Sequence, residues 1–315
     1  MTRTSAYLKT PIVILLMCLG SIAYGLPALA QAAPSLRGQT DLTKVYRDLP
    51  YVPGSRDSAQ TLDLYIPKQS AANNSPMPVV VFIHGGGWRA GSKERGPFPL
   101  LLQAGFAVAS IDYRLSQAAI FPAQIYDVKA AVRWLRAHCS QYNLDPKRFG
   151  AWGPSAGGHL VALLGTSGGV AAMEGNEGNN DQSSRVQAVC DFFGPTDFTA
   201  IDSQGGEHTA VPALLGSSPA KNPQAAKSAS PVTYVSSDCP PFFIAHGDHD
   251  AVVPLAQSQE LYDALRRAGV EAQLEVVPNG EHGLPKASPR LFPMAISFLK
   301  KHLSPASDTA SRQEK

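Results

Sequence analysis

The stretch FGAWGPSAGGHL, residues 149–160, places one serine among glycines at the point where an apolar run ends. Gly153 and Gly157 lie two residues before and two residues after Ser155, which is the spacing of a G-x-S-x-G nucleophile elbow. When a strand packs against the following helix through so short a turn, no space is left for side chains at those two positions. The pattern therefore predicts a strand, a sharp turn and a helix, with the Ser155 hydroxyl held above the carboxyl end of the strand.

Apolar runs and helical patterns alternate along the rest of the chain. Alternating polar and apolar residues at 44–52 and 61–67 predict a hairpin. The run at 79–83 is apolar throughout, as in a strand buried on both faces. Strands separated by helices indicate an α/β fold, with a mostly parallel sheet covered on both faces and the N-terminal antiparallel hairpin at one edge. Further strands are expected at 105–115, 149–152, 186–194, 240–250 and 270–278, and helices at 121–143, 156–164, 254–269 and 292–303.

Length and composition are those of a globular protein with a substantial core. The chain has 315 residues, of which 44% are hydrophobic and 17% are charged. The formal net charge is only +2 and the lysines and arginines are scattered, so we expect no nucleic-acid partner. Neither an internal repeat nor a dividing linker is evident. We expect one domain over 31–303, followed by a flexible polar tail at 304–315.

The N-terminus has the features of an export signal. Two basic residues precede the short apolar run PIVILLMCLG at 11–20, and ALA at 28–30 offers the small residues that a signal peptidase recognises. A membrane anchor is the alternative, but the apolar run is shorter than the roughly 20 residues needed to span a bilayer. We therefore expect a signal peptide over 1–30, cleavage near Ala30, a secreted or periplasmic protein and no stable membrane insertion.

The chain has four cysteines, one of them within the expected signal peptide. Cys18 raises the alternative of a lipoprotein, but Met17 is larger than the small residue usually found before a lipidated cysteine. The mature chain would keep Cys139, Cys190 and Cys239, which allow at most one disulfide outside the cytoplasm. Buried free thiols are the alternative to that disulfide.

A nucleophilic serine needs a base, and the base needs a carboxylate that orients it. In this architecture the partners belong on loops after later strands, in the order serine, acid, histidine. The segment NGEHG follows the last expected strand and supplies His282 as the base. The segment HGDHDAVVP supplies Asp248 and Asp250. Asp248 begins the loop and can hold the turn by accepting backbone N–H groups, whereas Asp250 lies further out, so we expect Asp250 to be the acid.

Other histidines are assigned structural roles. We expect His84 to brace the glycines that follow it, and His159, one turn after the serine, to lie in the core. His246 and His249 alternate with two aspartates, a pattern that could ligate zinc. One loop at a strand end rarely closes such a site alone, and no other motif offers distant ligands. We therefore expect no metal and no cofactor.

The segment HGGGW at 84–88 follows an early buried strand. Attack on an ester carbonyl creates an oxyanion that needs preorganised donors, and glycines bring backbone N–H groups close to it without interference from a Cβ. We expect Gly86 and Gly87 to donate, with Ala156 as the third donor. A phosphate-binding loop is the alternative, but neither glycine spacing of such loops is present.

Two stretches interrupt the alternation of strands and helices. The stretch at 167–185 is rich in Gly and Asn, and we expect an exposed loop that is long enough to rim a substrate site. Its acidic and amide residues leave a cation site as an alternative. The stretch at 199–237 has weak helical signals and no long apolar helix, so we expect no apolar lid for lipid surfaces.

Seven motifs occur in one order: HGGGW, DYRL, FPAQIYDVKAAVRWL, GPSAGGHL, FGPTD, HGDHDAVVP and GEHG. Together they resemble the α/β-hydrolase superfamily and, within it, carboxylesterases close to the hormone-sensitive-lipase group. The closer likeness is to the BD-FAE-like branch of bacterial acetyl and feruloyl esterases, and it covers nearly the whole mature chain.

The resemblance implies an α/β-hydrolase fold, and its pattern G-x-x-D-x-x-V-P also places the acid at Asp250. Pro154 departs from the branch, which more often has Ser, Glu or Asp there, and this would alter the pocket floor. The implied site residues are a triad of Ser155, Asp250 and His282 and an oxyanion hole of Gly86, Gly87 and Ala156.

We therefore expect a secreted serine carboxylic-ester hydrolase that works through an acyl-enzyme. The expected substrates are short acyl esters of small molecules or carbohydrates, such as acetyl or feruloyl esters of polysaccharides. An arylformamidase-like amide hydrolase is one alternative, against which export argues. A peptidase is another, although no propeller domain precedes the hydrolase. A catalytically inactive binding protein is a third, although the serine and the histidine are both present.

Overall fold

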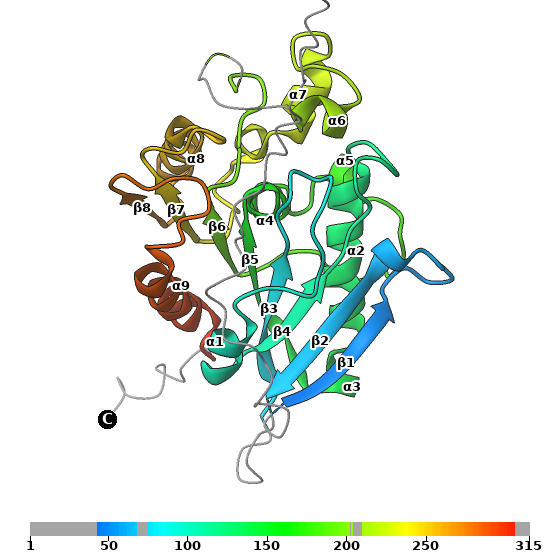
Figure 1. Ribbon diagram of the computed structural model, residues 1–315. Coiled ribbons are helices and arrows are strands. Elements are labelled where there is room, and N and C mark those ends of the chain that lie inside the picture. Colours follow the sequence, from blue (N-terminus) through cyan, green and yellow to red (C-terminus); the bar gives the residue numbers. More distant parts are fainter. Residues whose placement is uncertain (1–42, 68–74, 202, 204–209, 306–315) are drawn as a thin grey trace, which may run out of the picture. The chain divides into compact units, whose positions relative to one another are not determined.

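Parallel strands connected by helices make up most of the chain (Figure 1). The computed structural model describes residues 43–67, 75–201, 203 and 210–305, all within one unit, Ala32–Lys315. The described strands form one sheet in the order β1-β2-β4-β3-β5-β6-β7-β8. The strands are β1 (Thr43–Pro50), β2 (Thr61–Pro67), β3 (Met77–Ile83), β4 (Ala107–Ile111), β5 (Leu144–Pro154), β6 (Ala188–Phe192), β7 (Phe242–Gly247) and β8 (Ala272–Val277).

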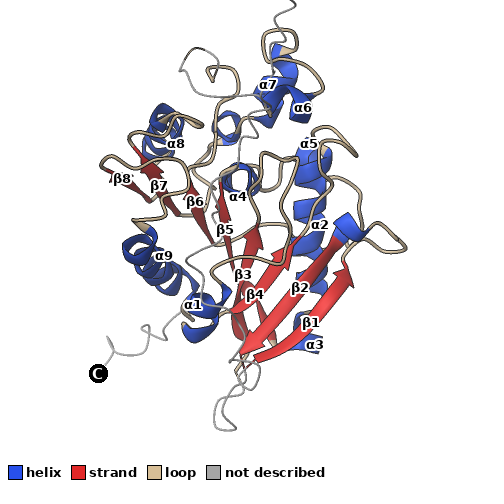
Figure 2. Cartoon of the chain, viewed as in Figure 1, coloured by secondary structure: helices blue, strands red, loops and turns tan. Residues whose placement is uncertain are grey.

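Helices cover both faces of the sheet (Figure 2). Residues of α2, α4 and α8 join one apolar cluster, and residues of α1 and α9 join another. Val79, Val81 and Ile83 of β3 face the first cluster, whereas Val80 and Phe82 face the second. The helices are α1 (Phe98–Gln103), α2 (Ala123–Ala137), α3 (Cys139–Tyr142), α4 (Ala156–Thr166), α5 (Ala171–Glu174), α6 (Val211–Leu215), α7 (Pro223–Ala229), α8 (Leu255–Arg267) and α9 (Ser288–Leu303), with 3₁₀ turns η1 (Ser58–Gln60) and η2 (Pro231–Tyr234).

The continuous apolar runs of the central strands follow from this burial. A strand covered on both faces places alternate side chains in two cores, so both sets must be apolar. The edge hairpin differs, since β1 pairs antiparallel with β2 and β2 pairs antiparallel with β4. The pairs β3–β4, β3–β5, β5–β6, β6–β7 and β7–β8 are all parallel. The predicted α/β sheet with an antiparallel N-terminal hairpin is confirmed.

Several elements differ from the sequence-based expectation. The helix expected over 121–143 is broken at His138, where α2 ends and α3 begins. The strand β5 begins at Leu144, five residues before the expected 149. Helix α1 was not expected, because its six residues, FPLLLQ, are too short to show a helical period.

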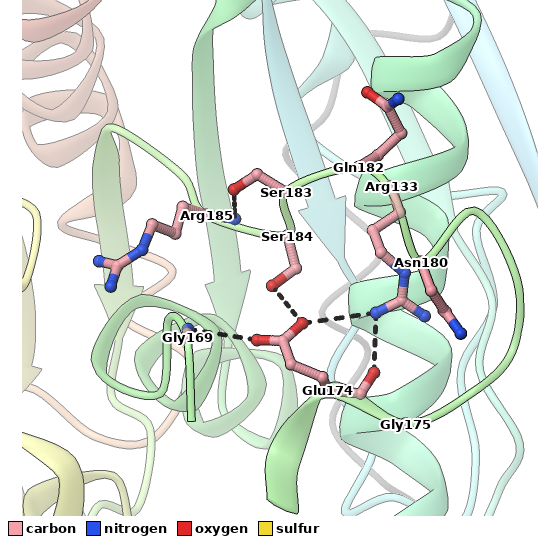
Figure 3. Close-up of a pocket in the computed structure, with 9 residues that line it drawn as sticks. All are labelled: Arg133, Gly169, Glu174, Gly175, Asn180, Gln182, Ser183, Ser184 and Arg185. Carbon is pink, nitrogen blue, oxygen red and sulfur yellow. Dashed lines mark hydrogen bonds and ion pairs between the residues drawn. The ribbon is translucent and has the colours of Figure 1, made fainter. Parts of the chain in front are cut away.

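The stretch 167–185 is anchored to α2 rather than exposed throughout (Figure 3). The Glu174 carboxylate accepts hydrogen bonds from Lys129 Nζ at 2.8 Å and Ser184 Oγ at 2.8 Å. Arg133 Nη1 donates to the Glu174 carbonyl oxygen at 2.7 Å. Lys129 and Arg133 are buried, so Glu174 compensates charge that would otherwise be costly inside the protein. The expectation of an exposed loop is therefore wrong for this part of the stretch.

Cys139, Cys190 and Cys239 are free thiols. Burial raises the pKa of Cys139 to about 11, which keeps that thiol protonated. The predicted signal peptide, 1–30, lies outside the described residues, as does the predicted tail from 306 onwards. Among the residues that the structure describes, no helix is both long and apolar enough to cross a membrane.

Candidate active site

Ser155 lies on the turn between β5 and α4, with φ +56° and ψ −120°. A positive φ is uncommon for a residue with a side chain and needs support from its surroundings. Here the Ser155 N–H donates to Phe192 O at 2.8 Å. A Cβ on Gly157 would lie 2.1 Å from Ile83 O, and one on Gly153 would lie 2.4 Å from Gly157 O. The two glycines therefore allow the close packing that holds the serine in this conformation.

Ser155, His282 and Asp250 are joined by hydrogen bonds. His282 Nδ1 lies 2.7 Å from Asp250 Oδ2, and His282 Nε2 lies 3.0 Å from Ser155 Oγ. Because a carboxylate only accepts, Nδ1 carries the proton and Nε2 is free to accept from the serine hydroxyl. The His282 side chain is 21% exposed and the Asp250 side chain is fully buried. The residues come from the loops after β8, β7 and β5, three strands that are parallel in the sheet.

Asp250 is held on both of its carboxylate oxygens. Oδ1 accepts from the backbone N–H groups of Val252 at 2.9 Å and Val253 at 2.8 Å. Burial acts to raise the pKa of Asp250, but the hydrogen bonds from His246 and His282 outweigh it and hold the pKa well below its ordinary value. Asp250 therefore stays ionised beside the imidazole.

Asp248 takes no part in this chain of hydrogen bonds among the described residues. Its Oδ1 lies 2.6 Å from His249 Nδ1. The hydrogen bond from His249, together with the backbone N–H groups of Asn279 and Gly280, lowers the pKa of Asp248. We expected Asp248 to hold its own turn, whereas these contacts tie it to the loop that carries His282.

His246 is the residue at the site that sequence reasoning missed. It is fully buried, its Nε2 donates to Val253 O at 2.8 Å, and Ser258 Oγ lies 2.6 Å from its Nδ1. Nε2 also lies 3.4 Å from Asp250 Oδ2, so two histidines contact one carboxylate. The sequence signal was the H-x-x-x-D spacing, which we had weighed only as a metal motif. Among the described residues, no group of three or more His, Cys, Asp or Glu could hold a metal ion.

His159 and His84 are both buried. Trp88 Nε1 donates to His159 Nδ1 at 3.2 Å, and His159 Nε2 donates to Ala229 O at 2.8 Å. Burial lowers the pKa of His159 to about 4, so it stays neutral. His84 Nδ1 donates to Gly85 O at 2.8 Å, and its ring stacks on Tyr113. His159 thus lies in the core and His84 braces the glycine loop, as predicted.

The glycine loop adopts a conformation that suits glycine. Gly86 has φ +114° and Gly87 has φ +60°, and a Cβ on Gly86 would lie 2.2 Å from Ala90 O. Within the described part of the chain, the N–H groups of Gly86 and Gly87 donate to no backbone carbonyl. Ala156 opens α4, where the first N–H groups of a helix have no partner within the helix. Among the described residues, the N–H groups of Gly86, Gly87 and Ala156 are therefore not used in hydrogen bonds to the backbone.

A small apolar pocket of about 50 Å³ lies beside Ser155. Gly87 and Ala156 line it, whereas Gly86 does not, and no residue of 167–185 does. The stretch 167–185 instead lines a separate, polar cavity of about 280 Å³ against Arg133 (Figure 3). The expectation that this stretch rims the site is therefore wrong for the pocket beside the serine. The remaining lining residues of the small pocket are Trp88, Pro195, Ile201, Ala210, Val211, Val252 and Val253.

The BD-FAE family model matches residues 62–265 of this chain. The chain is similar to Esterase LipQ of Mycobacterium tuberculosis, with 34% identity over 76% of this chain and 58% of that protein. It spans between 45% and 58% of the length of three mycobacterial esterases that it matches.

Two solved structures are similar over most of their length. One is a truncated carbohydrate esterase from gut microbiota, with a TM-score of 0.77 and 34% identity, covering 84% of this chain and 98% of that one. The other is an acetyl ester-xyloside bifunctional hydrolase from Caldicellulosiruptor lactoaceticus, with a TM-score of 0.68 and 27% identity, covering 81% of this chain and 95% of that one. These likenesses agree with the α/β-hydrolase fold.

A further carboxyl group, that of Asp191, lies beside Gly158 of α4. Asp191 of β6 is fully buried, its Oδ1 accepts from Gly194 N at 2.9 Å, and its Oδ2 has no partner among the described residues. Burial raises the pKa of Asp191 from 3.8 to about 6. Between those values the folded protein binds more protons at this group than the unfolded chain does. The free energy of unfolding therefore falls as pH rises through this window.

We predict that Asp191→Asn removes this pH dependence. The difference between 3.8 and about 6 corresponds to about 3 kcal/mol. Urea unfolding from pH 4 to 7 should show the wild type losing stability relative to the variant as pH rises. The opposite contribution of His159, with its lowered pKa, is present in both proteins and cancels in the difference. Parallel stability curves for the two proteins would contradict the assignment.

Proposed function

The chain belongs to the BD-FAE family of α/β-hydrolases, and we propose that it is a serine carboxylic-ester hydrolase that works through an acyl-enzyme on short acyl esters. The observation that carries the proposal is the unbroken series of hydrogen bonds from Asp250 through His282 to Ser155. Ser155, at the end of this series, lines an apolar pocket. A nucleophile, a base and an orienting carboxylate in this geometry are the parts that acyl transfer needs.

In the first half of the reaction, Ser155 Oγ attacks the ester carbonyl carbon while His282 Nε2 accepts the hydroxyl proton. The carbonyl oxygen becomes an oxyanion, which the N–H groups of Gly86, Gly87 and Ala156 stabilise. When the intermediate collapses, the bond to the leaving alcohol breaks and His282 gives its proton to that alcohol. The acyl group remains on Ser155.

In the second half, water replaces the alcohol. His282 takes a proton from the water as its oxygen attacks the acyl carbon, and the proton then returns to Ser155 Oγ as the carboxylic acid leaves. Asp250 stays ionised throughout and stabilises the imidazolium that forms in each half. The buried carboxylate, with its lowered pKa, suits this role.

The size of the pocket favours a short acyl group. A cavity needs about 10–15 Å³ to hold one water molecule, so a pocket of about 50 Å³ holds roughly four groups of that size. An acetyl group fits within this volume, whereas a feruloyl group would extend beyond it. Of the two acyl groups considered for the branch, the geometry therefore favours acetyl.

The descriptions of two similar solved structures support a carbohydrate as the alcohol part of the ester substrate. One solved relative is described as a carbohydrate esterase and another as an acetyl ester-xyloside hydrolase. We propose that this protein removes acetyl groups from polysaccharides or their fragments. We also propose that residues 1–30 direct its export and that 31–303 form the hydrolase domain, because a polymeric substrate lies outside the cell.

Replacement of the serine tests the mechanism. We predict that Ser155→Ala lowers turnover of p-nitrophenyl acetate by a factor on the order of 10⁴ or more. A serine-directed organophosphate should label the wild type once and leave Ser155→Ala unlabelled. Ser304→Ala, which removes an exposed serine at the end of α9, serves as the control and should behave as the wild type. An active Ser155→Ala enzyme would refute the proposal.

Substitution of the two aspartates in the β7–α8 loop should affect turnover and stability differently. Asp250→Asn should keep the fold but lose on the order of 10³ to 10⁴ in turnover, because an amide favours the wrong imidazole tautomer. Asp248→Asn should keep most of the turnover and lower the melting temperature slightly. Turnover and melting temperature of both variants decide the matter. An inactive, stable Asp248→Asn beside an active Asp250→Asn would reverse the assignment.

Acyl-chain preference tests the pocket. We predict that p-nitrophenyl acetate is cleaved much faster than the palmitate ester, and acetylated xylan fragments faster than feruloylated ones. The reason is the small volume, about 50 Å³, of the pocket beside Ser155. Initial rates across acyl lengths measure this preference. Comparable rates for acetate and palmitate, or a rate that rises only at an oil–water interface, would contradict it.

A further inference from the structure

Phe193 has an unusual backbone conformation beside the site. It follows β6 directly and has φ +46°, a region that residues with bulky side chains rarely adopt. Its side chain is nearly fully buried. Strained residues persist only where neighbouring structure holds them, and they concentrate at functional sites. The contacts of Phe193 therefore deserve a functional explanation.

The backbone around Phe193 is fixed on both sides. Phe193 N donates to Ala245 O of β7 at 2.8 Å, and the preceding Phe192 O accepts from Ser155 N at 2.8 Å. On the other side, Gly194 N donates to the buried Asp191 carboxylate at 2.9 Å. The turn is thus tied to the elbow, to β7 and to β6. Phe193 has little freedom to relax to an ordinary conformation.

This fixed backbone places the phenyl ring against the base. The ring centroids of Phe193 and His282 are 4.9 Å apart, and the ring planes are inclined by 68°. Such edge-to-face contacts are favourable for aromatic pairs. The two hydrogen bonds of His282 hold its nitrogens but leave the ring free to tilt about the line that joins them. A phenyl ring packed against the imidazole at this distance restricts such a tilt.

We propose that Phe193 is a positioning residue for His282: its left-handed backbone holds the phenyl ring against the imidazole and fixes the plane in which Nε2 faces Ser155. The effect on turnover rests on the proposed function, whereas the effect on the imidazole does not. Phe193 does not line the pocket beside Ser155, so its loss should lower kcat much more than it raises KM.

Two substitutions separate the contribution of the Phe193 phenyl ring from that of its backbone conformation. Phe193→Leu keeps apolar volume but removes the aromatic ring. Phe193→Gly removes the ring while suiting the positive φ, so the backbone can keep its conformation. Phe298→Leu is the matched control, because Phe298 is a buried phenylalanine whose ring packs on another histidine, His302, at a centroid distance of 4.6 Å.

The experiment measures kcat and KM for p-nitrophenyl acetate, the melting temperature, and the downfield proton resonance of the His282 Nδ1–H hydrogen bond to Asp250. For both Phe193 variants we expect kcat to fall between about tenfold and a hundredfold with KM little changed, as small misplacements of catalytic groups do. The Nδ1–H resonance should broaden or shift. Phe298→Leu should lower the melting temperature but keep kcat and the resonance.

The positioning role of Phe193 and the proposed esterase function are contradicted by different results. If folded Phe193→Leu and Phe193→Gly keep both the wild-type kcat and the wild-type resonance, the positioning role is refuted. It is also refuted if Phe298→Leu lowers kcat and perturbs the resonance as much as they do. If the wild type shows no esterase activity, the proposed function fails, and the resonance alone still decides whether Phe193 holds the imidazole.

Discussion

The close packing of α4 on the ends of β3 and β5 is the constraint on which the site depends. Gly157 lies so near the Ile83 carbonyl that a Cβ there would approach it to 2.1 Å, and a Cβ on Gly153 would approach the Gly157 carbonyl oxygen to 2.4 Å. This contact forces Ser155 into φ +56°, and the hydrogen bond from its N–H to Phe192 O holds it there. In this conformation the Ser155 hydroxyl lies 3.0 Å from His282 Nε2. A larger residue at either glycine would move the elbow away from the strand that carries the glycine loop.

The order of the strands explains how distant residues meet at that hydroxyl. Parallel strands end at the same edge of a sheet, so the loops after β3, β5, β6, β7 and β8 converge. The glycine loop comes from the first of these strands, the serine from the second, the acid from β7 and the histidine from β8. The strand β6 lies between the serine and the acid strands, and Phe193, which follows it directly, packs against the imidazole. Hydrogen bonds hold the pKa of Asp250 well below its ordinary value, and burial lowers the pKa of His159 to about 4, so the first stays ionised and the second stays neutral.

Much of this arrangement could be predicted from local sequence pattern. The glycines around Ser155 predicted the elbow, because steric exclusion at fixed spacing is a local property. The alternation of strands and helices predicted the parallel sheet for the same reason. Long-range contacts were harder to anticipate: the sequence argued against a metal at His246 but offered no other role for it, and its contacts are with Val253, Ser258 and Asp250. The stretch 167–185 looked like solvent-exposed loop by composition, yet buried Lys129 and Arg133 bind its Glu174. A positive φ at a phenylalanine has no sequence signature at all.

The central claim is that Ser155 carries the acyl group between the two halves of the reaction. The most direct measurement mixes the protein with p-nitrophenyl acetate, quenches the reaction in acid within one turnover, and identifies the acetylated peptide by mass spectrometry. The account predicts one acetyl group per protein, on the peptide that contains Ser155, and its disappearance as turnover ends. Acetyl on any other residue, or release of p-nitrophenol with no acetylated peptide at any time, would contradict it.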